Sequence, residues 1–395
     1  MSAQRPKVFM MDLWATVPYY TAYLSKALLE EDVALQVGSI TYYLDPGCFS
    51  SRGIKVDPGL LNIVGRFHMP RLPRRILKLL ESLLNLAALT LRFLFSPPDV
   101  VHVQFLPMLT SKVPLDLWFV EFCRRRGAKI VLTVHDLMPH DTGEAHKAAF
   151  LELYSGVDAI ICHSDSIRTR LGAEFSVPAN KVSVIPHGPF FYDLPPADSD
   201  DTLRDFNLNP AQQLVLWQGI IFPYKGIDLL LKAWQQVEAS CDTASLVIAG
   251  TGAPDLLDQI RAQVAALGLK RVNLHFRFIS TEELVALYRA ADVVVYPYRA
   301  ITTSGALATG LALGKTIVAS DLPVFRELLT NGQNARLVPP LDTNALGATL
   351  TELMQNPALR EQLADQVRAM HFGDESWLSI ANKTRAVYEQ ATRSQ

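Results

Sequence analysis

The sequence DVVVYPYRAITTSGALATGLALGKTIVAS, residues 292–320, has two short apolar runs separated by a polar loop and an alanine- and leucine-rich segment. The runs at 292–298 and 316–320 have the length and the β-branched content of buried strands. The segment that opens at about residue 304 has the composition of a helix. A strand, a helix and a second strand of these lengths predict a crossover unit of a parallel sheet.

The same alternation continues on both sides of this stretch. In the C-terminal half we expect strands at 213–219, 244–250, 272–278 and 335–340, and helices at 226–240, 254–267 and 281–291. In the N-terminal half we expect strands at 7–12, 33–40, 98–106, 129–136, 157–164 and 181–188, and helices at 19–32, 116–127 and 144–155. The expected fold class is α/β, with two Rossmann-like domains facing across a cleft at the carboxyl ends of their strands.

The length of 395 residues also favours two domains, because one hydrophobic core rarely organises so long a chain. Residues 191–205 are rich in Pro, Asp and Ser and lack periodicity, so we place the domain linker there. The expected domains are 1–192 and 205–370, followed by a C-terminal segment, 371–395, with an amphipathic helix.

Composition excludes several classes of protein. The net charge of −2 argues against a protein devoted to binding nucleic acid, and the apolar fraction of 49% is too high for a disordered chain. The four cysteines are far apart and form no Cys-x-x-Cys pair, so no zinc site or disulfide framework is expected and a reducing cytoplasm fits. The apolar N-terminus contains Asp12 and lacks a cleavage site, which favours a buried strand over a signal peptide.

Residues 66–96 combine a basic start with a long apolar stretch. Charged residues interrupt this stretch, so it does not reach the roughly 18 apolar residues of a spanning helix. Since the hydrophobicity surrounds much of the expected helix, we expect the segment to lie in a membrane interface, with the basic flank attracting anionic headgroups. The side chains expected to enter the acyl boundary are Leu79, Leu80, Leu83, Leu84 and Phe93. The alternative is a helix that packs on the first sheet.

Two stretches of the C-terminal half have residues suited to binding phosphate. Gly219, Lys225 and Gly226 lie where a strand passes into a helix, and a lysine at such a turn supplies a point charge for a diphosphate. Ser304 and Gly305 open a helix, whose unpaired N–H groups favour anions. The alternatives are an ordinary surface lysine and a serine that only caps the helix.

The chain resembles the retaining glycosyltransferases of family 4, which have the GT-B fold. The resemblance covers nearly the whole chain and rests on the order and spacing of many short motifs. These are PDVVHVQ, LTVHD, DAIICHS, VSVIPHG, YKGIDLLLKAW, VIAGTG, ISTEELVALYRAADVVVYPY and SGALATGLALGKTIVASDLPVFRELL. In this family the last helix crosses back to the first domain; the alternative is a cap on the second domain alone.

The resemblance implies transfer of a sugar from a UDP- or GDP-linked donor, held mainly by the C-terminal domain, to an acceptor held by the N-terminal domain. The nucleotide sugar is a co-substrate, and neither a cofactor nor a metal ion is expected. By position, Gly219, Lys225, Ser304, Gly305 and Ala306 correspond to the phosphate site, and Phe278 and Ile279 to the loop that holds the nucleobase. His135 matches a histidine near the reacting sugar, where the imidazole would orient a hydroxyl or stabilise the leaving diphosphate.

Two departures from the family pattern affect the donor site. Ile301 and Thr309 stand where the family usually has two glutamates, and the arginine usual near Gly219 has no counterpart. Thr309 would offer only a hydroxyl to the ribose. These losses leave the donor and the retention of configuration open.

The proton acceptor depends on the stereochemical course. In the retaining reaction of the family, the leaving phosphate takes the proton. An inverting enzyme needs a protein base, and Asp136 or Asp141 is the candidate. Structural roles are expected for His140, His163 and His187, and a metal site from His135, His140 and Asp141 is compatible with residue type alone.

The expected function is a glycosyltransferase that acts on a saccharide or polyprenyl-linked acceptor in bacterial surface polysaccharide or glycolipid synthesis. It is expected in the cytoplasm, peripherally attached through 66–96 to the inner face of the cell membrane. The alternatives are a catalytically inactive GT-B scaffold or glycan-binding subunit and an epimerase acting on a nucleotide sugar.

Overall fold

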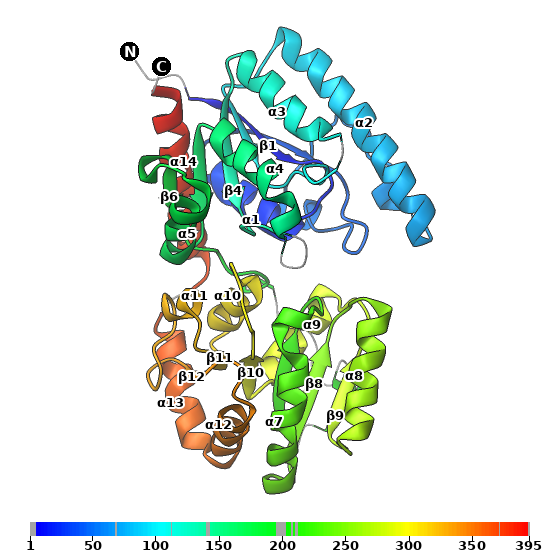
Figure 1. Ribbon diagram of the computed structural model, residues 1–395, viewed down its shortest axis with the longest axis vertical. Helices are drawn as coiled ribbons and strands as arrows, with labels where there is room; N and C mark the ends of the chain where they lie inside the picture. The colour runs from blue at the N-terminus through cyan, green and yellow to red at the C-terminus, as the bar shows by residue number, and fades with distance from the viewer. Residues whose placement is uncertain are drawn as a thin grey trace. The chain divides into compact units, whose positions relative to one another are not determined.

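The computed structural model describes residues 5–67, 69–111, 113–139, 143–194, 203–206, 208–209, 212–370 and 372–393. The chain divides into two compact units (Figure 1). Unit 1 comprises Met1–His187 and Ser376–Gln395, and unit 2 comprises Gly188–Glu375. Each unit is an α/β structure built on one parallel sheet, so the expected fold class is confirmed.

The sheet of unit 1 has the strand order β2-β1-β3-β4-β5-β6. Its strands are β1 (Lys7–Asp12), β2 (Ala34–Ser39), β3 (Val100–Val103), β4 (Lys129–Val134), β5 (Ala159–Cys162) and β6 (Val182–Val184). Its α-helices are α1 (Pro18–Glu30), α2 (Arg71–Phe95), α3 (Leu115–Arg125), α4 (Gly143–Gly156), α5 (Asp165–Phe175) and α14 (Asp374–Arg393), and short 3-10 helices lie at η1 (Ser50–Arg52), η2 (Val64–Arg66) and η3 (Ala179–Lys181).

The sheet of unit 2 has the order β12-β11-β10-β7-β8-β9. Its strands are β7 (Gln213–Gln218), β8 (Ala244–Ala249), β9 (Val272–His275), β10 (Val293–Tyr296), β11 (Thr316–Ser320) and β12 (Arg336–Val338). Its helices are η4 (Pro223–Lys225), α7 (Ile227–Ser240), α8 (Pro254–Ala266), α9 (Thr281–Ala290), α10 (Gly305–Ala312), α11 (Pro323–Arg326), α12 (Thr343–Gln355) and α13 (Pro357–Arg368).

The last two helices of unit 2, α12 and α13, were not anticipated from the sequence. Asp342 caps α12 and Asn356 caps α13, each by accepting a backbone N–H bond. The buried side chains of α12, among them Leu346 and Leu350, belong to the core cluster of α7 and the sheet. These helices complete the cover of the second sheet.

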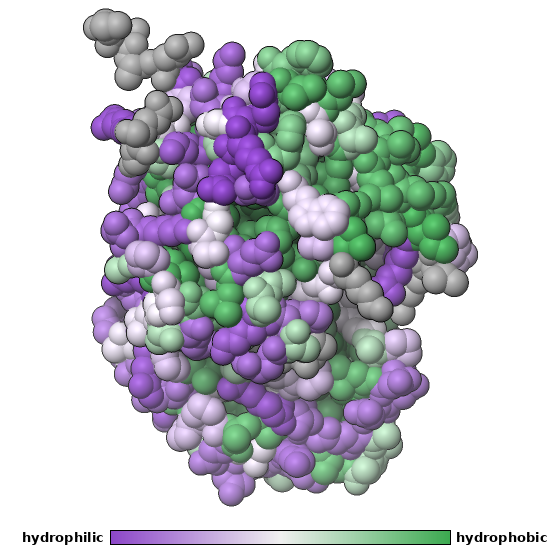
Figure 2. Space-filling view, turned by 45° about the horizontal axis from the view of Figure 1, so that its top comes forward, coloured by the Kyte–Doolittle hydropathy of each residue, from purple (hydrophilic) through white to green (hydrophobic). Residues whose placement is uncertain are grey.

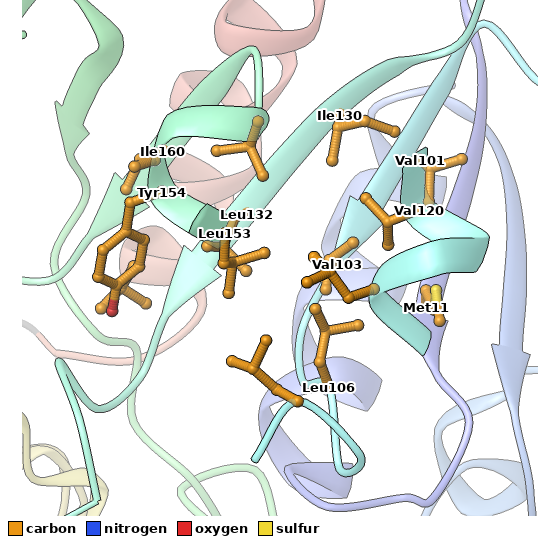
Figure 3. Packing of buried hydrophobic residues seen from close by; sticks show 14 of the residues in the cluster. Met11, Val101, Val103, Leu106, Val120, Ile130, Leu132, Leu153, Tyr154 and Ile160 are labelled. Atoms are coloured by element: carbon orange, nitrogen blue, oxygen red, sulfur yellow. The ribbon is translucent and has the colours of Figure 1, made fainter. Parts of the chain in front are cut away.

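Both cores consist of strand residues packed against helices. In unit 1, Val101 of β3 and Ile130 of β4 lie in one cluster with Val120 of α3 and Leu153 of α4 (Figure 3). Each such side chain contributes about 1.5–3 kcal/mol on full burial. The continuous apolar strands seen in the sequence are therefore strands covered by protein on both faces.

The C-terminal helix α14 packs on unit 1, as the expected fold requires. Tyr388 is buried and its hydroxyl lies 2.6 Å from Nδ1 of His102 in β3. Trp377 stacks on Tyr23 of α1 with ring centroids 5.5 Å apart. Arg385 pairs with Glu31 at 3.4 Å.

The change from unit 1 to unit 2 occurs between His187 and Gly188, whereas the sequence analysis ends the first domain at 192. Residues 188–194 contact unit 2: the backbone N–H of Phe190 donates to Thr309 Oγ1 at 3.3 Å, and Arg289 donates to the carbonyl of Leu194 at 3.1 Å. Of the expected linker 191–205, residues 195–202 lie outside the described part of the chain.

The buried side of helix α2 carries polar residues in its first half and apolar residues in its second half, whereas its exposed side is apolar. Glu81 and Asn85 are buried against residues 61–64, where Glu81 Oε1 accepts from the N–H of Val64 at 3.1 Å and Asn85 exchanges two bonds with the backbone of Leu61. The exposed side carries Ile76, Leu77, Leu79, Leu80, Leu84, Leu91, Leu94 and Phe95, of which Phe95 is 80% exposed. Figure 2 shows this broad hydrophobic area on the side of unit 1 that carries α2 in Figure 1.

Apolar side chains also lie on the buried side of α2, where Leu86 and Leu89 belong to the core of unit 1. One detail of the expected 66–96 segment is wrong. Phe93 cannot enter a membrane as expected, since it is 2% exposed and packs edge-on against Phe9 at 5.2 Å. Lys78 also turns inward and donates to the carbonyl of Trp14 at 2.6 Å.

Candidate active site

In unit 2 the proposed donor residues gather where the strand order reverses. The two central strands of the sheet are β10 and β7. The chain leaves β7 toward its neighbour β8 on one side and leaves β10 toward β11 on the other, so the two connections run in opposite directions. Ligands of open parallel sheets bind at the carboxyl end of such a pair. Gly219 follows β7 there, and Tyr298 follows β10.

Two glycines shape the turn that carries Lys225. Gly226 has φ +69°, and a methyl group on its Cα would lie 1.9 Å from the carbonyl oxygen of Pro297. Gly219 has φ +146°, and a methyl group there would lie 2.9 Å from Nζ of Lys225. Only glycine allows both the backbone conformation and the close approach, so the turn is held against the loop after β10.

The ammonium group of Lys225 lies between two buried aromatic rings. Its Nζ is 5.9 Å from the ring centroid of Trp217 and 5.8 Å from that of Tyr298. Burial raises the pKa of the Tyr298 phenol, and the neighbouring Ser304 hydroxyl partly lowers it. The ammonium group also lies next to Gly219, at the carboxyl end of β7.

Arg299 holds the Lys225 turn in place and was missed in the sequence. Its guanidinium donates to both carboxylate oxygens of Asp228, at 2.8 and 2.6 Å, and to the carbonyl of Pro223 at 2.8 Å. Burial acts to raise the pKa of Asp228, but the bonds from Arg299 outweigh it and the pKa is lowered. Asp228 lies within the motif YKGIDLLLKAW, but its pairing with Arg299 could not be predicted because the two residues are far apart in sequence.

Helix α10 begins with two unpaired backbone donors. Ser304 caps the helix: its Oγ accepts from the N–H of Leu307 at 3.1 Å, and its carbonyl accepts from Ala308. The N–H groups of Gly305 and Ala306 therefore have no acceptor within the helix. Together with the helix dipole, these groups favour an anion.

Two buried tyrosines fix the start of α10. Tyr296 Oη donates to the carbonyl of Ala306 at 2.7 Å, and Tyr288 Oη lies 3.1 Å from the same oxygen. A methyl group on Gly310 would lie 2.6 Å from Tyr296 Oη, so this glycine lets the helix approach the tyrosines. The expected phosphate site is rigid before any ligand binds.

Thr309 is buried, and its hydroxyl is already engaged. Oγ1 donates to the carbonyl of Gly305 at 2.9 Å and accepts from the N–H of Phe190. The threonine thus ties the chain entering unit 2 to α10. Ile301, the other departure from the family pattern, is half-buried.

The loop expected to hold the nucleobase is clamped on both sides. Arg277 donates to the carbonyl of Phe278 at 3.1 Å and pairs with Glu283 at 2.7 Å. Ser280 and Glu283 form a capping box at the start of α9. Phe278 is half-buried and Ile279 is buried. Their backbone is therefore well positioned to present a fixed edge to a base.

In unit 1, His135 lies in a cluster of aromatic rings at the carboxyl ends of β4, β5 and β6. The ring of Tyr20 is 4.7 Å from that of His135, 5.2 Å from His163 and 5.1 Å from His187. Trp377 of α14 lies 5.5 Å from the same tyrosine. Tyr20 was not expected from the sequence, because its position at the start of α1 gives no sign of contact with histidines far along the chain.

Buried polar groups connect His135 to the C-terminal helix. His135 Nε2 lies 3.0 Å from Oε1 of Gln104, and Nε2 of Gln104 lies 3.1 Å from Nε2 of His102. His102 Nε2 is also 2.7 Å from Thr133 Oγ1, and its Nδ1 contacts Tyr388. Gln104 was quoted within the motif PDVVHVQ but was given no role.

These imidazoles are neutral near pH 7. Burial lowers the pKa of His102 to about 3 and that of His163 to about 4. Burial, reinforced by His163, His187 and His102, lowers the pKa of His135 well below its usual value. An imidazolium at His135 is therefore disfavoured.

Asp136 follows His135 but is exposed. Its charge acts on His163 and Tyr154. His140, expected to be structural, and Asp141, the alternative base, lie outside the described residues. The metal site considered for them with His135 therefore lies partly outside the described residues as well.

Two family profiles match most of the chain. The profile "Glycosyltransferase Family 4" matches residues 17–188, and the profile "Glycosyl transferases group 1" matches residues 212–356. The first falls within unit 1 up to its last residue, and the second falls within unit 2.

Curated relatives are glycosyltransferases by name. An uncharacterized glycosyltransferase of Methanocaldococcus jannaschii is 25% identical over 259 residues, or 65% of each chain. A phosphatidyl-myo-inositol mannosyltransferase of Mycobacterium leprae is 33% identical over 177 residues, covering 44% of this chain and 45% of that protein. This chain thus spans less than two thirds of the length of these relatives.

Solved structures of the same fold align over almost the whole chain. Anabaena HepE in complex with UDP and glucose aligns with a TM-score of 0.74 at 17% identity, covering 97% of this chain and 100% of that one. Sucrose-phosphate synthase from Thermosynechococcus elongatus aligns with a TM-score of 0.73 at 20% identity, covering 99% and 100%. At these identities the likeness establishes the GT-B fold alone.

Proposed function

Since this chain belongs to the GT-B glycosyltransferases and combines a Glycosyltransferase Family 4 domain with a Glycosyl transferases group 1 domain, we propose that it transfers a hexose from a nucleoside-diphosphate sugar to a lipid-linked saccharide or glycolipid. One observation carries the proposal. In unit 2, Lys225 follows β7 and α10 follows β10, at the point where the strand order of the sheet reverses, and the N–H groups of Gly305 and Ala306 have no acceptor within α10. This arrangement provides positive charge and backbone donors for a leaving diphosphate.

The donor would bind with its diphosphate between Lys225 and the N–H groups of Gly305 and Ala306. Transfer breaks the bond between the sugar and the diphosphate, so negative charge grows on the leaving group, and fixed donors stabilise that charge without reorganising. The carbonyls and amides of Phe278 and Ile279 would contact the base. UDP and GDP are the nucleotides proposed, and the binding of UDP by HepE supports the first of them.

In unit 1, His135 would orient a hydroxyl near the reacting carbon. A neutral imidazole is suited to accept or donate a hydrogen bond but not to act as an acid at pH 7. For retention, the leaving phosphate takes the proton of the attacking hydroxyl. If configuration inverts, Asp136 remains the proposed base, since it is exposed and carries its charge next to the histidines.

We place the acceptor at a membrane because of α2. None of the helices in the described part of the chain has the length and apolar content to span a bilayer. Instead, α2 exposes its apolar side, and Arg75 in its first turns and Arg66 in the preceding η2 are exposed as well. A helix of this kind binds at a lipid surface, its apolar side buried and its cationic end near anionic headgroups. The inner face of the cell membrane fits this chemistry, and the name of the Mycobacterium leprae relative supports a glycolipid acceptor.

The experiment that tests the function begins with a thermal-shift screen against UDP, GDP, ADP, dTDP and their sugar conjugates, since a ligand of the folded state raises the transition temperature. The nucleotide sugar that binds is then incubated with vesicles containing polyprenyl-phosphate-linked saccharide, and the lipid extract is analysed for an added hexose. A shift with a nucleotide and a new hexose on the lipid support the proposal. Binding without transfer to any lipid-linked or soluble saccharide contradicts it.

The second candidate is a glycan-binding scaffold without catalytic activity. Ile301 and Thr309 replace both glutamates of the family pattern, and the Thr309 hydroxyl is engaged by Gly305 and Phe190. A scaffold predicts no thermal shift with any nucleotide sugar but retention on immobilised glycan.

A further inference from the structure

Two cationic side chains of α2 contact the body of unit 1. Nζ of Lys78 donates to the carbonyl of Trp14 at 2.6 Å and lies 5.5 Å from the centroid of the indole ring. The guanidinium of Arg74 lies 3.8 Å from the ring centroid of Tyr43. Trp14 follows β1 and Tyr43 follows β2, so both cations lie beside the loops that leave the carboxyl ends of these strands.

Neither cation forms an ion pair within the part of the chain that the structure describes. The acids whose charge acts on Lys78 are Asp12 and Glu81, and the carboxylates of both accept bonds from backbone N–H groups. Arg92, farther along α2, does have an acidic partner, since it lies 2.6 Å from Asp57. The two inward cations near the start of α2 therefore lack the counter-charge that Arg92 has.

The two cations also lie close to each other. Arg74 and Lys78 are four residues apart on one helix, a spacing that brings Cβ atoms to about 5–6 Å. Burial lowers the pKa of Lys78, and the charge of Arg74 adds to this effect, whereas Asp12 and Glu81 oppose it. Like charges at this spacing destabilise a helix, so an anion bound between them would stabilise the pair.

The arrangement suits a phosphate group in particular. The ring of Tyr43 covers one face of the Arg74 guanidinium, which leaves the N–H groups at its edge for two oxygens of one phosphate. Lys78 has three N–H donors, of which the carbonyl of Trp14 takes one. Both cationic side chains are half-buried, so a ligand can reach them from the surface.

We propose that Arg74 and Lys78 bind the phosphate groups of the acceptor, so that the acceptor is a saccharide joined to its lipid by a phosphate or diphosphate and not a neutral glycolipid. The lipid chain would lie along the exposed apolar side of α2, which includes Leu77 and Leu80 in the same turns. The proposal deepens the proposed function and rests on it in naming a lipid-linked saccharide as the acceptor. The bulk headgroups are left to the exposed Arg75 and its neighbours.

The direct test is the Kd of citronellyl diphosphate, a soluble probe, measured by isothermal titration calorimetry of the full chain without lipid. Arg74→Gln/Lys78→Gln removes both charges, and glutamine keeps an N–H donor for the carbonyl of Trp14. We expect about tenfold weaker binding, because charge-assisted bonds are lost. Lys7→Gln/Lys383→Gln removes two exposed charges of unit 1 and should leave the Kd as it is. Equal Kd values for wild type and R74Q/K78Q overturn the proposal.

A single variant protects the test against misfolding. The guanidinium of Arg74 makes no hydrogen bond within the described residues, so Arg74→Gln should fold with an unchanged Tm. We expect about fivefold weaker binding of citronellyl diphosphate with this variant. A folded R74Q that binds the probe as wild type does also overturns the proposal.

The donor site of unit 2 is a second place where a diphosphate could bind. The titration is therefore repeated with UDP or GDP at saturating concentration. Binding of citronellyl diphosphate that persists with the nucleotide and is weakened in R74Q/K78Q supports the proposal. Binding that the nucleotide abolishes belongs to the donor site and overturns it.

Bulk lipid headgroups have the same anionic chemistry, so vesicle binding is measured as well. Co-sedimentation with phosphatidylglycerol vesicles should be weakened more by Arg66→Gln/Arg75→Gln than by R74Q/K78Q, because Arg66 and Arg75 are the exposed pair. Loss of sedimentation in R74Q/K78Q with an unchanged Kd for the soluble probe would assign Arg74 and Lys78 to bulk headgroups and overturn the proposal.

Turnover separates this inference from the proposed function. With a saccharide on citronellyl diphosphate we expect about a tenfold higher KM in R74Q/K78Q, and with the same saccharide as a neutral citronellyl glycoside an unchanged KM. If the probe binds through Arg74 and Lys78 but no hexose is transferred to any acceptor, the transferase function fails and the subsite stands. If wild type uses both acceptors with equal KM, the subsite fails and the transferase function stands.

Discussion

The two sheets end in chemically opposite ways. At the carboxyl edge of unit 2 lie the ammonium of Lys225 and the uncapped N–H groups of Gly305 and Ala306. At the corresponding edge of unit 1 lie His135 and His163, which are buried and neutral. The same parallel topology thus presents positive charge in one unit and neutral imidazoles, after β4 and β5, in the other.

Removing the positive charge of Lys225 in unit 2 should have the largest effect on the rate of hexose transfer. For Lys225→Ala we expect about a 100-fold loss of kcat/KM, because the leaving diphosphate loses its fixed cation. The measurement is the rate of hexose transfer with the donor found in the thermal-shift screen. Lys232→Ala, which removes an exposed lysine of α7, is the control and should stay within about twofold. Equal losses in both variants would remove the special role of Lys225.

Adding a negative charge next to His135 in unit 1 should make the activity depend on pH. In Gln104→Glu a carboxylate faces Nε2–H of His135 and favours the imidazolium, so the pKa of His135 rises. Below the raised pKa, Nδ1 is protonated and no longer accepts. We therefore expect kcat/KM about tenfold below wild type at pH 6 and recovery toward pH 8. Wild type should show no His135 titration in this window, because burial holds that pKa well below 6.5.

The control for this variant is Gln235→Glu, on the exposed side of α7. It makes the same change of charge away from the histidines and should leave the pH profile as it is. A Gln104→Glu enzyme with the wild-type pH profile would show that His135 is not held as described.

The exposed face of α2 gives a smaller effect that is confined to the membrane. For Leu80→Glu/Leu84→Glu we expect about tenfold weaker binding to anionic vesicles, since two leucines no longer enter the acyl boundary. Co-sedimentation with phosphatidylglycerol vesicles measures it. Leu29→Glu/Leu378→Glu changes two other exposed leucines and should bind as wild type does. Unchanged sedimentation of the α2 variant would exclude this face as the membrane contact.

The buried histidines also make unit 1 sensitive to acid. A pKa lowered from 6.5 to about 4 at His163 means that the unfolded chain binds more protons, so stability is present above pH 6.5 and is lost as pH falls toward 4. At pH 5 this loss is about 2 kcal/mol for His163. In His163→Asn we expect the fall in Tm between pH 7.5 and pH 5 to be about 4–8 °C smaller than in wild type. An identical fall in both proteins would contradict the buried neutral state.

The fold was largely readable from the sequence because parallel strands buried on both faces are continuous apolar runs. The helices α12 and α13 were not predicted, although the buried Leu346, Leu350 and Leu353 of α12 recur at helical spacing. Their capping residues, Asp342 and Asn356, are common in loops. The side of α2 that faces the protein also could not be predicted. Its apolar residues would suit a core as well as a lipid surface. The side that faces the protein is the one on which Glu81 and Asn85 bond to residues 61–64 and Leu89 and Phe93 enter the core.

Residues of the candidate site could be predicted from the sequence only where their role depends on their neighbours in the chain. Lys225 and Ser304 follow from turns and helix starts next to them in the chain. Gln104, Tyr20 and Arg299 could not be found in this way, because each acts on a residue that is distant in sequence and adjacent only after folding. Even the direction of the bond between Gln104 and His135 depends on β1, because the amide nitrogen of Gln104 lies 3.0 Å from the sulfur atom of Met10.

Hydrogen–deuterium exchange of the intact protein, with nucleotide and with nucleotide sugar, tests the division between the two sheet edges most directly. We predict that UDP or GDP alone slows exchange in the segments 219–226 and 304–312 but not in 133–137 and 161–165. The sugar conjugate should slow exchange in both sets. Protection of the unit 1 segments by the nucleotide alone, or of neither set by any nucleotide sugar, would contradict the account.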